Sequence, residues 1–243
     1  MPAFCITSTE RACTHAVGPY LPARDLADSF SYKWEPKRTD GLIPLDVADM
    51  DLQPPSELIN AVLARVGQRI FGYGVVPDGY TDAVVRWHLK RYRAPIEPSW
   101  ILPTAGTLFG LAMALRAVTS PGDSVVVLKP GFGAFDEIIC GCGRILLPLP
   151  LSEDEGRYSF DFSALESAFR SGNPSAIVLC NPHNPTGTSW GEENLARFAA
   201  LCRKYCVAII SDEVHADYSW AQDGHVSICS EGVGAAPNTV AIT

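Results

Sequence analysis

Hydrophobic and polar positions along the chain follow three successive patterns, and each predicts a different kind of structure. The first part of the chain, up to about residue 60, is proline-rich and shows no sustained period. Apolar residues then recur at helical spacing after Ser56 and again from about Tyr80 to Arg93, which predicts two helices. From Trp100 onward, short β-branched runs alternate with helical patterns, as is typical of an α/β domain with a largely parallel sheet.

Short apolar runs after Trp100 have the length and composition of strands. They are 101–104, 124–128, 144–147, 176–179, 207–210 and 238–243. Helices are expected over 107–118, about 162–170 and 192–205, with a polar loop around 153–156. The predicted organisation is an irregular N-terminal segment and arm over 1–60, followed by an α/β sheet domain over 61–243.

The composition is that of an ordinary folded protein and excludes several classes of partner. Of the 243 residues, 47% are hydrophobic and 19% are charged, with a formal net charge of -8. Nucleic-acid binding needs clustered lysine and arginine, so the acidic balance argues against it. No apolar run approaches the roughly 18 residues that span a membrane, and residues 1–22 lack the features of a signal peptide. We therefore expect a cytoplasmic protein.

The eight cysteines predict neither a metal site nor a disulfide framework. Cys140 and Cys142 lie two positions apart, and Cys202 and Cys206 lie four apart, without the second pair that a zinc ribbon requires. Reduced thiols packed as small apolar side chains are the simplest interpretation.

Two polar segments carry the most information about chemistry, because each begins where an apolar run ends. They are Asn-Pro-His-Asn-Pro-Thr-Gly at 181–187 and Ser-Asp-Glu-Val-His at 211–215. Open α/β sheets bind ligands at the carboxyl ends of their strands, so we expect Asn184, Asp212 and His215 to meet in one crevice. Taken singly they can be a turn, a helix cap and a core histidine. Together they indicate a site.

These three residue types suit a protonated pyridine ring. A carboxylate at Asp212 would stabilise a protonated ring nitrogen, since a nearby negative charge favours the cationic form. The Asn184 amide and the His215 imidazole can hydrogen-bond a phenolic oxygen on the same ring.

The other parts of such a site lie earlier in the chain. Gly106 and Thr107 open a predicted helix, whose free N–H groups and dipole suit a phosphate. Phe132 lies in a Pro-Gly-Phe-Gly turn, from which it can stack on a ring. With the three ring-facing residues, these are the parts of a pyridoxal 5'-phosphate (PLP) site, in which the cofactor serves as an electron sink.

Several short motifs, in a fixed order, resemble one family. They are Val-Ala-Asp-Met-Asp at 47–51, Phe-Gly-Tyr at 71–73, Cys-Asn-Pro-His-Asn-Pro at 180–185 and Asp-Glu-Val-His at 212–215. From about Leu45 to Thr243 the chain resembles the fold-type I PLP enzymes of the class I/II aminotransferase superfamily, in their cystathionine β-lyase-like (carbon–sulfur lyase) branch. The resemblance implies a three-layer large domain with a mostly parallel sheet.

The resemblance also implies a role for each matching residue. Asp212 would pair with the pyridine nitrogen, and Asn184 and His215 would lie beside the ring oxygen. Gly106 and Thr107 would form part of the phosphate cup.

Further matching residues would act at the edges of the site. Phe132 takes the stacking position, where the family usually has tyrosine. Tyr73 would reach the phosphate of a neighbouring subunit, which implies a homodimer with composite sites. Ala48 and Asp49 lie in a segment that lines the substrate pocket in the family.

The Schiff-base lysine of the family is absent from this sequence, so no catalytic residue is assigned. In the family, the strand matching 239–243 leads into a Ser-x-Ser-Lys-like segment, and this sequence ends about three or four positions short of it. Lys129, at a strand end near Phe132, is the nearest substitute, but an ordinary strand-end charge explains it more simply. The last strand, which lies between 101–104 and 239–243 in the family, is also missing, together with the C-terminal small domain. We therefore expect a loose sheet and poor solubility for the isolated chain.

The expected function is β-elimination from a cystathionine- or cysteine-conjugate-like amino acid, which releases a thiol, pyruvate and ammonia. Transamination is the alternative within the family, because the two reactions differ mainly in where a proton is placed. A catalytically inactive remnant or pseudoenzyme is the alternative that the missing lysine raises. Gly131 and Gly133 also suggest a nicotinamide-binding fingerprint, but Asp136 stands in place of its third glycine, which disfavours that class.

Overall fold

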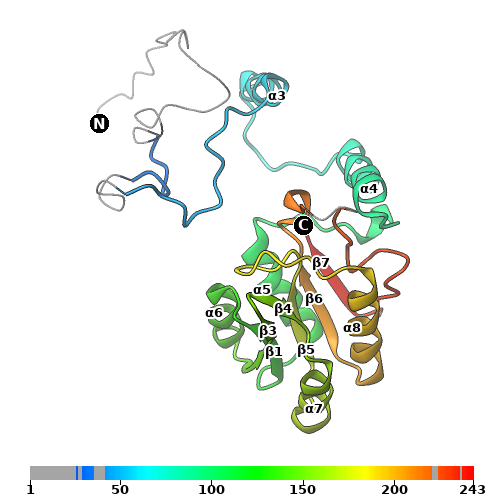
Figure 1. Ribbon diagram of the computed structural model, residues 1–243. Helices are drawn as coiled ribbons and strands as arrows, with labels where there is room; N and C mark the ends of the chain where they lie inside the picture. Colours follow the sequence, from blue (N-terminus) through cyan, green and yellow to red (C-terminus); the bar gives the residue numbers. More distant parts are fainter. Residues whose placement is uncertain (1–25, 27–28, 36–41, 221–223, 236) are drawn as a thin grey trace. The chain divides into compact units, whose positions relative to one another are not determined.

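The computed structural model describes residues 26, 29–35, 42–220, 224–235 and 237–243. Contacts within the chain define two compact units, Met1–Gly74 and Val75–Thr243 (Figure 1). The domain boundary expected after residue 60 stays a prediction.

Helix α3 (Ser56–Gly67) is the main regular element in the described part of the first unit, and it confirms the helix expected from Ser56. It begins after Pro55, carries Glu57 in its first turn and Arg65 in its last, and so follows the charge preference of a helix dipole. Its large apolar side chains are all exposed; they are Leu58, Ile59, Val62, Leu63 and Val66.

A hydrogen-bonded cluster precedes α3 in the first unit and centres on the carboxylate of Asp51. Trp34 Nε1 donates to Asp51 Oδ1 at 2.7 Å, and Lys33 Nζ lies 2.9 Å from Asp51 Oδ2. The same ammonium donates to the carbonyl oxygen of Asp49 at 2.8 Å. The hydrogen bonds from Trp34 and Lys33 hold the pKa of Asp51 below its ordinary value. They therefore tie Lys33 and Trp34 to the Val-Ala-Asp-Met-Asp segment.

The second unit is built on a five-stranded sheet in the order β2-β1-β5-β6-β7. The strands are β1 (Ser124–Lys129), β2 (Ile145–Pro150), β5 (Ala176–Cys180), β6 (Ala208–Asp212) and β7 (Thr239–Ile242). All four pairings are parallel, which confirms the predicted sheet. In the register Cys180 pairs with Asp212 and Asp212 with Ile242, so the carboxyl ends of three adjacent strands lie level with one another.

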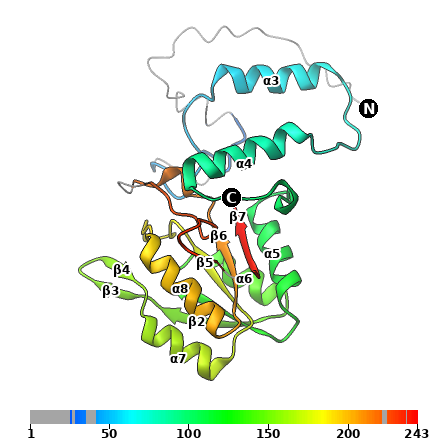
Figure 2. The ribbon, with the colours of Figure 1, turned by 90° about the vertical axis from the view of Figure 1, so that its right-hand side faces the viewer.

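Helices lie on both faces of this sheet (Figure 2). The helices of the second unit are α4 (Asp78–Tyr92), α5 (Thr107–Val118), α6 (Gly133–Gly141), α7 (Phe162–Gly172) and α8 (Glu192–Lys204), with short 3-10 turns η1 (Pro98–Trp100) and η2 (Ala216–Tyr218). Of these, α5 and α6 pack on one face of the sheet, and α7 and α8 pack on the other. Except for α6 and the two short turns, these confirm helices expected from the sequence.

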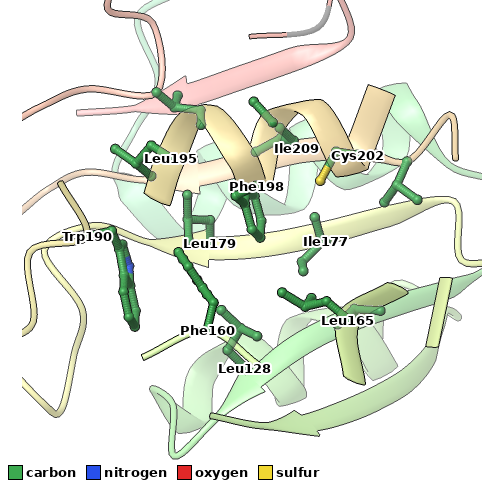
Figure 3. Packing of buried hydrophobic residues seen from close by; sticks show 14 of the residues in the cluster. Leu128, Phe160, Leu165, Ile177, Leu179, Trp190, Leu195, Phe198, Cys202 and Ile209 are labelled. Carbon is green, nitrogen blue, oxygen red and sulfur yellow. The ribbon is translucent and has the colours of Figure 1, made fainter. Parts of the chain in front are cut away.

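Alternation along the buried strands divides the core into two clusters, since successive side chains point to opposite faces. Ile177 and Leu179 pack with side chains of α7 and α8, including Phe198. Ala176 and Val178 pack on the other face with side chains of α5 and α6. In the first cluster the ring of Phe160 stacks on Trp190 and on Phe198, with centroid separations of 4.2 and 5.1 Å (Figure 3). The result is the expected three-layer α/β arrangement.

Two local expectations are wrong, and one helix was not expected. Residues 101–104 form no strand: among the described residues β7 is the last strand of the order, and Pro103 has no N–H to donate to a ladder. The polar segment around 153–156 is not a plain loop but a hairpin of β3 (Ser152–Asp154) and β4 (Arg157–Ser159). Its turn residues Glu155 and Gly156 both have positive φ, as a two-residue hairpin turn requires. Helix α6 was not expected at all.

The capping of α7 gives a direct test of local stability. Asp161 precedes the helix, and its Oδ1 accepts the backbone N–H of Ala164 at 2.9 Å. Replacing Asp161 by alanine leaves that N–H without its partner, so we expect a loss of about 0.5–2 kcal/mol in the free energy of unfolding. Urea denaturation measures the loss, and Asp161→Asn, which can still accept the bond, should recover most of it.

Candidate active site

The two motif segments leave the sheet side by side at the carboxyl ends of β5 and β6. The backbone N–H of Asn181 donates to the carbonyl oxygen of Asp212 at 2.9 Å, so the ladder continues one step past the strand pairing. The backbone N–H of Glu213 likewise donates to the carbonyl oxygen of Ile242 at 2.7 Å. Residues 181–187 and 211–215 therefore begin at one edge of the sheet, as their positions in the sequence predict.

Asp212 ends β6 with its carboxylate withdrawn from water. The residue is 5% exposed, and Oδ1 accepts the backbone N–H of Val214 at 3.1 Å. This is the one hydrogen bond that the described residues give its side chain. Burial raises the pKa of Asp212, and the negative charge of Glu213 adds to the rise, while the Val214 bond and His215 oppose it. Within the described residues, this buried carboxylate thus has little compensation for its charge.

Asn184 lies in a tightly hydrogen-bonded loop. The backbone N–H of His183 donates to the carbonyl oxygen of Thr188 at 2.8 Å, and that of Gly187 to the carbonyl oxygen of His183 at 2.7 Å. Gly187 has a φ of 71°, in the region that favours glycine. The backbone N–H of Asn184 donates to Cys180 Sγ at 3.3 Å, and the residue is half-buried.

His215 follows Asp212 by three residues and is half-buried. Its carbonyl oxygen accepts the N–H of Tyr218, which starts the turn η2. The turn from Asp212 to η2 therefore keeps the carboxylate and the imidazole on one short stretch of backbone.

The expected phosphate and stacking residues lie at other loops of the second unit. Gly106 is the N-cap of α5 with a φ of 139°, and no side chain caps the helix. The first N–H groups of α5, next to the half-buried Thr107, are thus left for another acceptor. Phe132 follows β1 and is 39% exposed, with one edge packed against Phe135 at a centroid separation of 5.5 Å.

Lys129 is committed to an ion pair. Its Nζ lies 2.7 and 2.6 Å from the two carboxylate oxygens of Asp136, in the first turn of α6. An ammonium group that donates hydrogen bonds to both oxygens of a carboxylate is a poor nucleophile. The contact therefore fits the ordinary strand-end interpretation of Lys129.

Other predicted residues belong to the first unit. Tyr73, Ala48 and Asp49 are all exposed there, and Asp49 uses its backbone carbonyl to bind Lys33. Their assignment to the phosphate and the substrate pocket stays a prediction.

Three buried polar residues that the sequence analysis left without a role lie beside these strand ends. They are Asn181, Glu213 and His225. Glu213 and Asn181 had a signal, because both directly follow buried strands. His225 had none, because its partner Glu213 lies twelve positions earlier in the sequence.

His183 makes the loop of Asn184 sensitive to acid. The residue is 3% exposed, its Nδ1 lies 2.8 Å from Thr186 Oγ1, and burial lowers its pKa to about 4. The unfolded chain, with an ordinary histidine pKa, then binds a proton that the folded chain does not, so stability falls as the pH falls from about 6.5 to about 4. We expect a loss of up to about 3 kcal/mol.

Urea denaturation between pH 7 and pH 4 checks this expectation. A His183→Gln variant has no ring to protonate, so its stability should depend less on pH across that window. Equal slopes for the two proteins would contradict the assignment.

The described residues support neither a metal site nor a membrane-spanning helix. No group of three histidine, cysteine, aspartate or glutamate side chains is placed there to hold a metal ion. Over the same part of the chain, no helix has the length and apolar character needed to cross a membrane.

The second unit is therefore a three-layer α/β domain whose polar residues gather at the carboxyl ends of parallel strands, the class in which ligands bind at that edge. Residues 40–243 match the family model described as aminotransferase class I and II. The chain belongs to this family, which is PLP-dependent, and the resemblance drawn from the motifs is confirmed.

Three proteins illustrate which members of the family this chain is similar to. The chain is 40% identical over 180 residues to cystathionine beta-lyase PatB of Bacillus subtilis (strain 168), covering 74% of this chain and 46% of that protein. It is 29% identical over 219 residues to cystathionine beta-lyase of Corynebacterium glutamicum, covering 90% and 57%. Its structure resembles PLP-containing cystalysin from Treponema denticola, with a TM-score of 0.83, 28% identity and coverage of 91% and 57%. The chain spans about half the length of the curated relatives it matches.

Proposed function

We propose that this chain is the cofactor-binding part of a PLP-dependent carbon–sulfur β-lyase, acting on an amino acid with sulfur on its β-carbon. The observation that carries the proposal is the buried Asp212 carboxylate at the carboxyl end of β6, with one hydrogen bond from the described residues. A buried carboxylate is stabilised by a cation, and a protonated pyridine nitrogen is one. Relatives named cystathionine beta-lyase support the reaction class.

The remaining residues fit the rest of the cofactor. Asn184 and His215 carry donors that suit the ring oxygen, and the uncapped first turn of α5 at Gly106 and Thr107 suits the phosphate. Phe132 has an exposed ring surface to cover the pyridine face.

Two parts of the proposal concern the assembly. Tyr73 is fully exposed and would bind the phosphate in a second subunit, so the proposed state is a homodimer. Ala48 and Asp49 would line the substrate pocket. The cytoplasmic location expected from the sequence belongs to this proposal as well.

When bound, PLP withdraws electrons from the α-carbon of an amino acid. Asp212 would hold the proton on the ring nitrogen, and Asn184 and His215 would fix the ring plane by binding its oxygen. Phe132 would exclude water from one ring face. In the overall reaction the substrate loses its α-proton, its Cβ–S bond breaks, and the sulfur leaves as a thiol. Hydrolysis of the remainder gives pyruvate and ammonia, and no residue of this chain is assigned to the proton transfer.

Titrating the purified chain with PLP and recording its visible absorption tests the proposal. Saturable binding with a shifted absorption band is the expected result, and the absence of any saturable change would overturn it. A band that borohydride reduction fixes to one lysine would identify a covalent attachment, and peptide mapping would name that lysine.

The products separate the alternatives. With an S-substituted cysteine, a lyase releases pyruvate and a thiol, whereas an aminotransferase yields an oxo acid that retains its sulfur. PLP binding without either product would favour a catalytically inactive remnant.

A further inference from the structure

Glu213 is a fully buried carboxylate with three hydrogen-bond partners, one in its own strand β6 and two in a distant loop. Its side chain is 0% exposed. Oε1 accepts Ser211 Oγ at 2.9 Å and the backbone N–H of Ile228 at 2.8 Å, and Oε2 lies 3.0 Å from His225 Nε2. Such a group is held strongly in one place, because removing any partner leaves a buried charge uncompensated.

The loop that supplies two of these three partners, residues 225–228, also binds the neighbouring strand end. Asn181 Nδ2 donates to the carbonyl oxygen of Val226 at 2.8 Å. The 225–228 segment is therefore bonded to the first residue after β5 and to the first residue after β6. The ring of Tyr92, at the end of α4, packs nearly perpendicular to the ring of His225 at a centroid separation of 5.1 Å.

Asp212 lies between these two attachments. Its carbonyl oxygen accepts the N–H of Asn181 at 2.9 Å, and its Oδ1 accepts the N–H of Val214 at 3.1 Å. Because Val214 directly follows Glu213, a shift of the Glu213 backbone moves the donor that orients the Asp212 carboxylate.

We propose that Glu213 is a positioning residue: by its bonds to the 225–228 segment it fixes the end of β6, and so the direction of the Asp212 carboxylate. The proposal rests on the proposed function, in which Asp212 binds the cofactor ring. The charge of Glu213 also contributes to the raised pKa of Asp212, so the pair is coupled electrostatically as well as through the backbone.

The contact with His225 allows the charge of the Glu213 side chain to be tested separately from the shape of that side chain. Since Nε2 faces a carboxylate, it carries the hydrogen, and Nδ1 is buried without a hydrogen-bond partner among the described residues. In Glu213→Gln the amide oxygen can keep the bonds to Ser211 and Ile228. The amide nitrogen, however, meets the Nε2 hydrogen, and moving that hydrogen to Nδ1 would bury an N–H without an acceptor.

Hydrogen exchange on the full, cofactor-free chain tests the proposal. The reporters are the amides of Val214 and Asn181, which bind the carboxylate and the carbonyl of Asp212. We expect Glu213→Ala to raise their exchange rates at least about tenfold relative to the amides of β1, and Glu213→Gln to give an intermediate rise. The matched control is Arg144→Met, which removes a buried side chain bonded to Thr119 beside the start of β2 and should leave both reporters unchanged.

Several outcomes would overturn the proposal. Unchanged exchange at both reporters in a folded Glu213→Ala protein is one, and equal acceleration by Arg144→Met is another. If Glu213→Ala does not fold, His225→Phe takes its place, because it keeps the ring packing but lacks the N–H donor, and the same criterion applies.

PLP titration then separates this proposal from the one on which it rests. We expect the apparent Kd to rise by about tenfold or more in Glu213→Ala and by less in Glu213→Gln. If the unmodified chain does not bind PLP, the proposed function fails, whereas the exchange rates still decide whether Glu213 positions Asp212.

Discussion

An Asp212→Asn variant is expected to lose PLP affinity and, at the same time, to gain stability without the cofactor. Removing one partner of a buried charge pair costs about 2–5 kcal/mol of binding energy, which corresponds to a roughly thirty-fold to several-thousand-fold higher Kd. Asparagine keeps the shape of the side chain and the acceptor for the Val214 N–H, so the loss reports the charge itself.

The gain in stability follows from the direction of the Asp212 pKa. Burial raises the pKa above its value in the unfolded chain, so between the two values the folded chain binds more protons. Stability therefore falls as the pH rises through that window, and the ionised carboxylate destabilises the cofactor-free fold at neutral pH. Asparagine has no proton to lose, so the cofactor-free variant should melt higher at pH 7.

Spectroscopic titration with PLP and thermal melts of the cofactor-free proteins measure the two effects. Glu137→Gln is the control, because it removes one negative charge from an exposed position of α6 and should change neither quantity appreciably. A variant that binds PLP as tightly as the parent chain would show that Asp212 does not face the ring. Lower stability of the cofactor-free variant would show that the carboxylate is better solvated than its burial indicates.

The buried strands and the chemistry at their ends could be predicted because both depend on local sequence. Runs such as Val207 to Ile210 are too apolar to be exposed, and parallel strands place the residues that come after them at one edge of the sheet. Asn184 and Asp212 are therefore found at neighbouring strand ends, as expected. The cofactor roles of these residues came from the family motifs and stay proposals.

The remaining features depend on partners that lie far away in the sequence. Residues 101–104 have the composition of a strand, but a strand exists only where a ladder partner lies beside it. Apart from Tyr158 the 152–159 hairpin is polar, and its signal was the Glu155-Gly156 turn rather than a hydrophobic pattern. The bond from Ser230 Oγ to the carbonyl oxygen of Tyr92 joins residues 138 positions apart, which no local pattern reveals.

The aromatic stack beneath the β5 strand end connects core stability to the candidate site. Trp190 stacks on Phe160 and donates its Nε1 hydrogen to the carbonyl oxygen of Cys180 at 2.8 Å, next to the start of the Asn184 loop. Phe160 in turn stacks on Phe198 of α8 (Figure 3). A cavity at Phe198 would therefore loosen the packing that holds Trp190 against the strand end.

Replacing Phe198 by alanine is expected to lower the free energy of unfolding by about 3–5 kcal/mol, because a fully buried ring is lost and a cavity remains. Phe198→Leu keeps most of the volume and should cost less than about 1.5 kcal/mol. Ala200→Ser, at an exposed position of the same helix, should stay within about 0.5 kcal/mol. Urea denaturation of the three variants gives the values. Equal losses for alanine and leucine would mean that the ring, and not the filled volume, stabilises the stack, since only the ring can pair face to face with Phe160.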